Sequence, residues 1–215
     1  MKKNKYTIWD QLANYFSIDI GLDLGTANVV VYIKDKGVVA NEPSVVAVQI
    51  DKIGEVNILA VGDEAKQMIG KTPGSIEAIR PLKEGVIADF EVTQKMLEYF
   101  ISKYHKNNFL ARPRVVVSVP IGITPVEKRA VVEAAESAGA REVYLIEETM
   151  AAALGANMDS VLNSRGGMII DIGGGTTGIS VISLGGLVIS RSIKTAGDSM
   201  NQAIITYVKN SYGLL

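Results

Sequence analysis

Two short stretches of this chain share one pattern: an apolar strand ends in Asp-x-Gly, a turn of glycine and other small residues follows, and a second strand begins. The first stretch is Asp23–Asn28 and the second is Asp171–Thr177, so the two aspartates are 148 positions apart. Three consecutive glycines in the second stretch are costly in an apolar hairpin, because glycine weakens a strand, and they often mark a close approach of the backbone to a ligand. The repeated pattern predicts an internal duplication of architecture.

The segments around the two turns alternate between strand-like and helix-like periodicity. The predicted strands are Ile18–Leu24, Asn28–Lys34, Val45–Ile50, Val56–Val61, Val115–Val119, Val143–Ile146, Met168–Ile172, Gly178–Leu184 and Leu187–Ile193. The predicted helices run from Val92 to Tyr104, from Pro125 to Ala138, over about Glu148–Ala156, and onward from about Asp198. Because almost wholly apolar strands alternate with helices, the pattern indicates an α/β fold with a largely parallel sheet covered on both faces.

The helix predicted at Pro125–Ala138 carries a signal at each end. Thr124 suits the N-cap position and Pro125 suits the first helical position. Gly139 suits the position just after the C-cap, where the backbone often adopts a positive φ. We therefore expect this helix to begin and end at these residues.

The two repeats differ in length. The first runs from about Ser17 to Thr149, whereas the second has 49 residues from Gly167 to Leu215 and reaches only its first helix. We therefore expect the second half to be incomplete, as in a truncated version of a longer protein.

Composition excludes several kinds of site. The chain of 215 residues has no cysteine, which excludes disulfides, thiolate metal sites and cysteine catalysis, and its one histidine excludes a multi-histidine metal cluster. With 22 Lys and Arg against 23 Asp and Glu, the net charge is −1, so no overall charge attracts nucleic acid, and we expect no nucleic-acid partner.

The two glycine turns are candidate phosphate-binding sites, because small residues let backbone N–H groups approach an anion. The aspartates that precede them, Asp23 and Asp171, would face a metal ion or its waters. Each turn alone also fits an ordinary hairpin, whereas the matched pair favours a clamp on a phosphate chain. The candidate phosphate-binding residues are Gly25, Thr26, Ala27, Asn28, Gly173, Gly174, Gly175 and Thr176.

Two acidic residues, Glu147 and Glu148, lie between the halves where a strand ends and a helix begins. A carboxylate at this point is suited to polarise a water molecule that attacks a terminal phosphate. Acidic residues are also common at helix starts, where they interact with the helix dipole. The spacing does not choose between these two interpretations.

The first seventeen residues predict a short amphipathic helix. Its apolar face carries Ile8, Trp9, Leu12 and Phe16, and lysines 2, 3 and 5 precede it. Such a helix suits a membrane surface, and it equally suits packing on its own domain.

Several runs together resemble the MreB family of bacterial actin homologues. These runs are Asp23–Asn28, Asn41–Ala47, Ile69–Pro73, Ala78–Pro81, Gly85–Asp89, Val119–Thr124, Leu145–Glu148 and Asp171–Thr177. The resemblance covers nearly the whole chain from Ile18 to Leu215. It implies an actin-like (ribonuclease H-like) fold of two half-domains around a nucleotide cleft, with the second half incomplete here. It also implies a protein that binds ATP and Mg²⁺ and polymerises with itself on the inner, cytoplasmic face of the cell membrane. Such filaments guide wall synthesis together with membrane proteins of morphogenesis and so determine rod shape.

The resemblance also implies roles for single residues. Asp23–Asn28 is similar to the first phosphate motif and Asp171–Thr177 to the second. Glu148 corresponds to the residue that polarises the hydrolytic water in a slow ATPase, with Thr176 or Thr177 helping to place that water. Phe109 and Leu110 correspond to an apolar loop that inserts into the membrane, and the N-terminal helix corresponds to an anchor used by some members.

The same resemblance predicts the domain limits and shows two departures. Residues 1–17 would form the membrane anchor, 18–150 the first half with an inserted subdomain at about 34–81, and 151–215 the start of the second half. Members usually have proline where this chain has Thr149, and an acidic residue where it has Gly178. The resemblance places the segment that holds adenine and ribose beyond Leu215.

Two other functions remain open at this stage. One is a non-enzymatic scaffold, a truncated paralogue that binds filaments or membrane without turning over nucleotide. The other is a small-molecule kinase or chaperone-type ATPase on the same fold, against which the family-specific runs outside the phosphate motifs argue.

Overall fold

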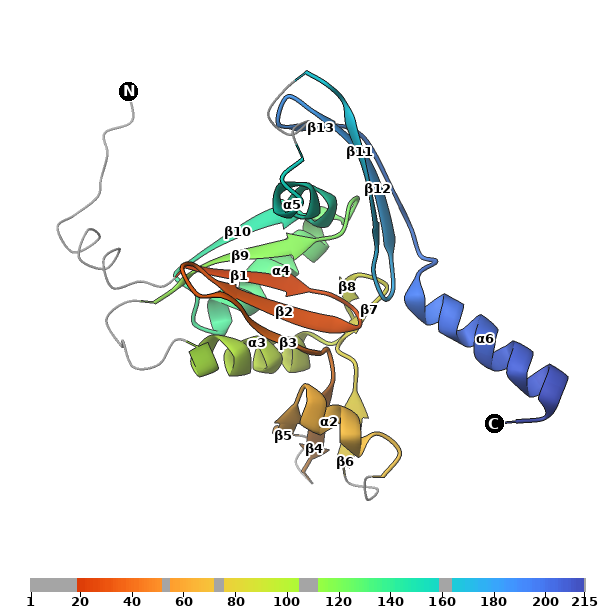
Figure 1. The fold of residues 1–215 in the computed structure, drawn as a ribbon. Coiled ribbons are helices and arrows are strands. Elements are labelled where there is room, and N and C mark those ends of the chain that lie inside the picture. Colours follow the sequence, from red (N-terminus) through yellow and green to blue (C-terminus); the bar gives the residue numbers. More distant parts are fainter. Residues whose placement is uncertain (1–18, 52–54, 72–75, 105–111, 159–163, 215) are drawn as a thin grey trace.

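The largest layer of the molecule is a five-stranded sheet with the strand order β10-β9-β1-β2-β3 (Figure 1). The computed structural model describes residues 19–51, 55–71, 76–104, 112–158 and 164–214. β1, β9 and β10 pair in parallel, β2 pairs antiparallel with β1, and β3 pairs antiparallel with β2 at the edge of the sheet. The strands are β1 (Asp19–Leu24), β2 (Asn28–Ile33), β3 (Gly37–Pro43), β9 (Arg114–Val119) and β10 (Glu142–Glu147).

One face of this sheet forms the main core. α3 (Phe90–Tyr104) and α4 (Pro125–Ser137) lie on this face, and α5 (Glu148–Gly155) lies on the other, where it contacts β9 and β10 (Figure 1). Alternate residues of the strands point toward α3 and α4 because successive side chains of a strand leave opposite faces. Asp23 leaves β1 on the side of α5, opposite the buried Leu22 and Leu24. The core includes Ile20, Leu22, Val29, Val31, Met96, Leu97, Phe100, Val115 and Val117.

A small subdomain is inserted after β3. It consists of a sheet in the order β5-β4-β6 with α2 packed on it. The predicted limits of about 34–81 included β3, but β3 pairs with β2 in the main sheet, so the separate sheet begins only at Val46. Its elements are β4 (Val46–Ile50), β5 (Val56–Val61), α2 (Asp63–Met68) and β6 (Ile76–Ile79), and a short hairpin of β7 (Leu82–Lys83) and β8 (Val86–Ile87) follows.

The second repeat begins with a three-stranded antiparallel sheet, β11-β12-β13, followed by α6. The order of three antiparallel strands and then a helix repeats β1, β2, β3 and α3, apart from the insertion. Asp23 and Asp171 are each the next-to-last residue of a first strand, opposite Val30 and Gly178 respectively. The predicted duplication is therefore confirmed. The elements are β11 (Gly167–Ile172), β12 (Thr177–Ser183), β13 (Gly186–Ile193) and α6 (Gly197–Tyr212).

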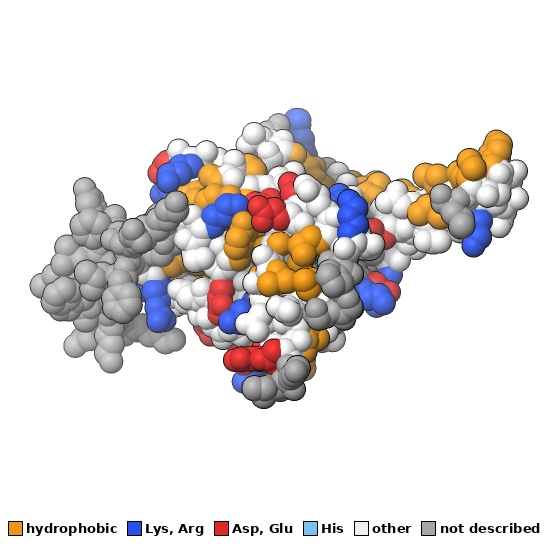
Figure 2. Space-filling view, turned by 90° about the horizontal axis from the view of Figure 1, so that it is seen from below, with side chains coloured by type: hydrophobic (Ala, Val, Ile, Leu, Met, Phe, Trp, Pro, Cys, Tyr) orange, Lys and Arg blue, Asp and Glu red, His pale blue; other side chains and the backbone are white. Residues whose placement is uncertain are grey.

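Helix α6 extends away from the five-stranded sheet and from the β11-β12-β13 sheet, and it has no buried residue (Figure 1). In Figure 2 it forms the arm at the right, and hydrophobic side chains lie along it. The apolar face predicted from its periodicity is therefore exposed in the part of the chain that the structure describes. Its exposed large hydrophobic residues are Met200, Ile204, Ile205, Tyr207 and Tyr212. No helix among the described residues combines the length and apolar character needed to cross a membrane.

The end signals of α4 are confirmed. The Thr124 hydroxyl accepts a hydrogen bond from the backbone N–H of Glu127, and the Glu127 carboxylate accepts one from the N–H of Thr124. Gly139 follows the C-cap with φ 106°. The residues predicted to contact a membrane, Ile8, Trp9, Leu12, Phe16, Phe109 and Leu110, lie outside the described residues.

Candidate functional site

The two glycine turns meet at the junction of the two repeats. A Cβ added to Gly174 would lie 2.6 Å from the Cβ of Ala27, and one added to Gly175 would lie 2.8 Å from the Oγ1 of Thr26. Contacts this short are not tolerated between real side chains, so both positions require glycine. Turns that are 148 positions apart in the sequence are thus in direct contact in the fold.

A cavity of about 420 Å³ opens beside this contact. Residues of both turns line it, including Asn28 and Gly173, and Asp198 and Asn201 of α6 close one side. Asp23 reaches it from the end of β1. Small residues leave backbone groups accessible on two sides of this cavity, which is the arrangement that a chain of phosphates requires.

The first turn is held from outside by a residue that the sequence analysis missed. The Ser44 hydroxyl donates to the carbonyl of Gly25, and the Ser44 N–H donates to the carbonyl of Ala27 at 2.9 Å. Ser44 is fully buried. The side-chain amide of Asn28 donates to Asn41 at 2.9 Å. Because Ser44 follows β3, the end of the third strand fixes the shape of the turn between the first two.

The second turn is held by the start of α6. The N–H of Gly197 donates to the carbonyl of Gly173 at 3.1 Å, and the N–H of Asp198 donates to the carbonyl of Gly174 at 2.9 Å. Orphan N–H groups at the start of the helix therefore find acceptors in the turn. The turn and α6 form one unit.

The two candidate catalytic threonines have different surroundings. The hydroxyl of Thr177 is buried and donates to the backbone carbonyl of Thr195 at 2.7 Å. The methyl group of Thr176 lies against the β7–β8 turn, 3.1 Å from the position that a Cβ added to Gly85 would take. Thr177 thus ties β12 to the segment after β13, and Thr176 contacts the first repeat.

The β7–β8 turn is a second link between the repeats. Glu84 and Gly85 have φ angles of 51° and 80°, as a two-residue hairpin with both φ positive requires. The N–H of Gly85 donates to the hydroxyl of Thr26 at 3.2 Å, and Glu84 forms an ion pair of 2.7 Å with Lys194. The Lys194 side chain is 70% exposed, so this pair adds little stability and mainly marks where the halves approach.

Three carboxylates from different elements lie close enough to influence each other. Burial, together with the smaller effect of the charges of Asp23 and Asp171, raises the pKa of Glu148 to about 7. Burial and the charge of Asp23 also raise the pKa of Asp171. Like charges that disfavour each other's ionised form create a place where a cation is favourable.

The geometry of these carboxylates bears on how a cation would bind. Within the described ranges, no three Asp, Glu or His side chains converge closely enough to ligate a metal ion together. Asp23 also accepts a hydrogen bond from Ser118 of β9. After Arg114 at its start, Ser118 is the only polar residue of β9, and this interruption of an apolar run could have been used to find it.

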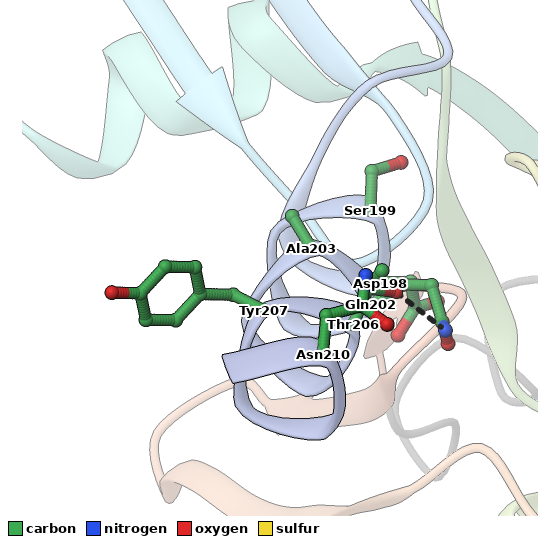
Figure 3. A pocket seen from close by; sticks show the side chains of 7 residues that line it. All are labelled: Asp198, Ser199, Gln202, Ala203, Thr206, Tyr207 and Asn210. Atoms are coloured by element: carbon green, nitrogen blue, oxygen red, sulfur yellow. Dashed lines mark hydrogen bonds between the residues drawn. The ribbon is translucent and has the colours of Figure 1, made fainter. Parts of the chain in front are cut away.

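A larger hollow of about 770 Å³ runs along α6 and is a poor candidate (Figure 3). All seven side chains that line it, among them Gln202, Ala203 and Tyr207, come from this one helix. It has no opposing wall in the described part of the chain, and it contains neither turn. The cavity at the meeting of the two turns is therefore the better candidate site.

The sequence matches the family model "MreB/Mbl protein" over residues 17–215. It is 56% identical over 202 residues to the cell shape-determining protein MreB of Escherichia coli strain K12, covering 93% of this chain and 58% of that protein. It is 54% identical over 200 residues to the cell shape-determining protein Mbl of Bacillus subtilis strain 168, with 93% and 59% covered. The chain thus spans under three fifths of the length of these relatives.

Solved structures agree with this match. MreB5 of Spiroplasma citri bound to ADP superposes with a TM-score of 0.82 at 40% identity, over 92% of this chain and 58% of that one. The same protein bound to AMPPNP gives 0.81 at 41% identity, over 91% and 58%. A MamK double helical filament, at 22% identity and a TM-score of 0.74, shares the fold. With the duplicated topology and the paired glycine turns, these matches show that the chain belongs to the MreB/Mbl family of proteins with an actin-like α/β fold.

Proposed function

We propose that this protein binds ATP with Mg²⁺ at the two glycine turns and assembles with itself into actin-like filaments that determine cell shape. The observation that carries the proposal is the contact between Gly174 and Ala27, which brings one turn from each repeat to a single cavity. Relatives that are described as cell shape-determining proteins, and a relative solved with ADP and with AMPPNP, support it.

Each part of the site has a separate task in this proposal. Backbone N–H groups of Gly25–Asn28 and Gly174–Thr176 bind phosphate oxygens from opposite sides, while the N–H of Gly173 donates to the carbonyl of Thr176 and closes the second turn. Asp23 and Asp171 hold Mg²⁺ through water, and Ser118 fixes the Asp23 carboxylate by its hydrogen bond. When bound, Mg²⁺ neutralises charge that develops on the phosphates.

Glu148 orients the water that attacks the terminal phosphate and accepts a proton from it. A general base works best when its pKa lies near the working pH. Because burial and two neighbouring aspartates raise the pKa of Glu148 to about 7, its carboxylate is suited to this task near neutral pH. Thr176, at the end of the second turn, helps to place the water.

Competition binding tests the nucleotide part of the proposal. A fluorescent ATP analogue with Mg²⁺ should bind the chain and be displaced by ATP and by tripolyphosphate, since the donors of the cavity come from phosphate-binding turns. AMP should displace it poorly. Sedimentation with and without ATP then tests assembly. Displacement by AMP as strong as by ATP would contradict a phosphate clamp, and assembly without any nucleotide binding would support the non-enzymatic scaffold instead.

We further propose that the filaments lie on the inner face of the cytoplasmic membrane and act with membrane proteins of wall synthesis. The membrane contacts would be the N-terminal face with Ile8, Trp9, Leu12 and Phe16, and the pair Phe109 and Leu110. Fully burying such side chains is worth roughly 1.5–3 kcal/mol each, so two anchors add and assembly strengthens them by avidity.

Liposome co-sedimentation tests the membrane contacts. Trp9→Ala and Phe109→Ala should each reduce the bound fraction several-fold, and the double variant should remove most of it, because each change deletes one apolar anchor. Phe90→Ala, which removes a partly exposed aromatic residue elsewhere, serves as a control that should bind normally. Binding of the double variant at the level of the parent would overturn this proposal.

A further inference from the structure

The first turn of α5 is attached to the second repeat by a buried pair of hydroxyl groups. The Oγ1 of Thr149 lies 2.8 Å from the Oγ of Ser180 in β12, and either atom can donate. The two residues are 0% and 1% exposed. Because a buried hydroxyl without a partner is costly, each of these groups depends on the other.

The methyl group of the same threonine fills a place where β12 has no side chain. A Cβ added to Gly178 would lie 2.9 Å from the Cγ2 of Thr149 and 3.6 Å from the Cδ1 of Ile121. Gly178 and Ser180 lie on the same face of β12, so Thr149 contacts two successive positions of that face. Thr149 and Gly178, both noted above as departures from the residues usual in the resembling motifs, thus lie against each other.

This contact lies beside the candidate catalytic carboxylate. Glu148 directly precedes Thr149 and directly follows β10, so its backbone continues from the main sheet of the first repeat. β12 begins at Thr177, immediately after the second glycine turn. Thr149, the residue next to Glu148, therefore joins the start of α5 to the strand that leaves the phosphate-binding turn.

We propose that Thr149 is a positioning residue that holds Glu148 in register with the second glycine turn through Ser180 and Gly178. Its hydroxyl fixes the start of α5 along β12, and its methyl group fixes the distance between helix and strand. This inference rests on the proposed role of Glu148 in hydrolysis. Without the hydroxyl pair, the start of α5 is held only by its covalent link to β10 and by its packing, and the carboxylate is less well placed.

The test measures phosphate release at a series of ATP concentrations, so that kcat and KM are separated. Thr149→Val keeps the shape of the side chain but removes the hydroxyl, and should lower kcat about tenfold while KM stays within twofold. Thr149→Ser keeps the hydroxyl but loses the methyl contact with β12, and should lose less of the rate than Thr149→Val. Ser180→Ala removes the same hydrogen bond from the strand and provides an independent variant. Thr206→Val, on the exposed side of α6, is the matched control and should behave as the parent.

A double variant separates positioning from a general loss of stability. If Thr149 acts through Glu148, adding Thr149→Val to Glu148→Gln should lower kcat no further, because effects that pass through one group are not additive. An equal fall of kcat in both backgrounds, or a parallel loss of ATP affinity, would show a merely structural role and overturn the inference. If the parent hydrolyses ATP and Thr149→Val is equally active, the inference is overturned. If the parent binds ATP but does not hydrolyse it, the hydrolytic part of the proposed function is contradicted instead.

Discussion

Replacing Gly174 by valine is expected to weaken the binding of ATP and Mg²⁺ by about a hundredfold or more. The added Cβ would meet the Cβ of Ala27 at 2.6 Å and its backbone N at 3.1 Å. Neither atom belongs to a flexible side-chain end, so the two turns must separate. Hydrogen bonds from backbone N–H groups to a charged ligand are worth about 1.5–3 kcal/mol each, and about 1.4 kcal/mol corresponds to a factor of ten. Loss of two such bonds gives the expected effect.

A glycine at the end of α5 supplies the control. Gly155 ends α5, and a Cβ added there would meet nothing within 4 Å. Gly155→Ala should therefore bind the nucleotide as tightly as the parent does. Calorimetry or displacement of a fluorescent analogue measures both variants, with thermal unfolding to verify that each is folded. Parent-like affinity of Gly174→Val would show that phosphates are not bound between the turns.

Replacing Glu148 by glutamine is expected to stabilise the protein at pH 8 and to leave its stability nearly unchanged at pH 5. The pKa of Glu148 is about 7 in the folded protein against the ordinary 4.5, chiefly because of burial and then because of Asp23 and Asp171. Between these pH values the unfolded chain releases the proton while the folded protein keeps it, so stability falls as the pH rises. Above pH 7 the cost is complete, at about 3 kcal/mol.

The substitution removes this cost, since glutamine has a similar shape and no charge. We expect the free energy of unfolding at pH 8 to increase by roughly 1–3 kcal/mol, because the buried amide offsets part of the gain. Urea unfolding at pH 5 and pH 8, with a chelator present to exclude Mg²⁺, measures the difference. Glu136→Gln, on the exposed side of α4, changes the net charge equally and should show no such gain at pH 8. The same gain at both pH values for Glu148→Gln would contradict a strained carboxylate.

A destabilising carboxylate at this position is what a catalytic role would produce. The fold holds Glu148 beside Asp23 and Asp171, although burial and like charge both disfavour its ionised form. Proteins commonly sacrifice stability at sites where function needs an unfavourable arrangement. The stability gain of Glu148→Gln should therefore accompany a loss of phosphate release, which links this prediction to the proposed function.

Much of the local structure could be predicted from the sequence. The strands on both sides of each glycine turn and the helix capped by Thr124 follow from periodicity and from residues with strong local preferences. The limits of the insertion could not be predicted in the same way. Gly37–Pro43 looks like part of a separate subdomain along the chain, but its pairing with β2 places it in the main sheet. Strand pairing depends on a second segment of the chain, and the residues of a short strand do not by themselves specify which segment that is.

Some residues of the candidate site could likewise be identified from the sequence, and others could not. The glycines of both turns and the aspartates before them could be identified from the sequence because the same pattern occurs twice, although each turn alone also fits an ordinary hairpin. Ser44 and Gly85 could not be identified in this way, because serine and glycine are common in loops and neither residue lies near a glycine turn of the site in the sequence. Their roles arise only from contacts with Gly25 and Thr26 in the fold.

The sequence by itself determined the two repeats, the positions of both glycine turns and the ends of α4, because each depends on residues within a few positions of one another. The tertiary structure decided what those parts do together. It placed Gly174 against Ala27, raised the pKa of Glu148 by burying it near two aspartates, and paired Thr149 with Ser180, 31 positions away. Charge interactions and buried hydrogen bonds depend on distance and on exclusion of water, and both are set only when segments far apart in the chain pack against each other.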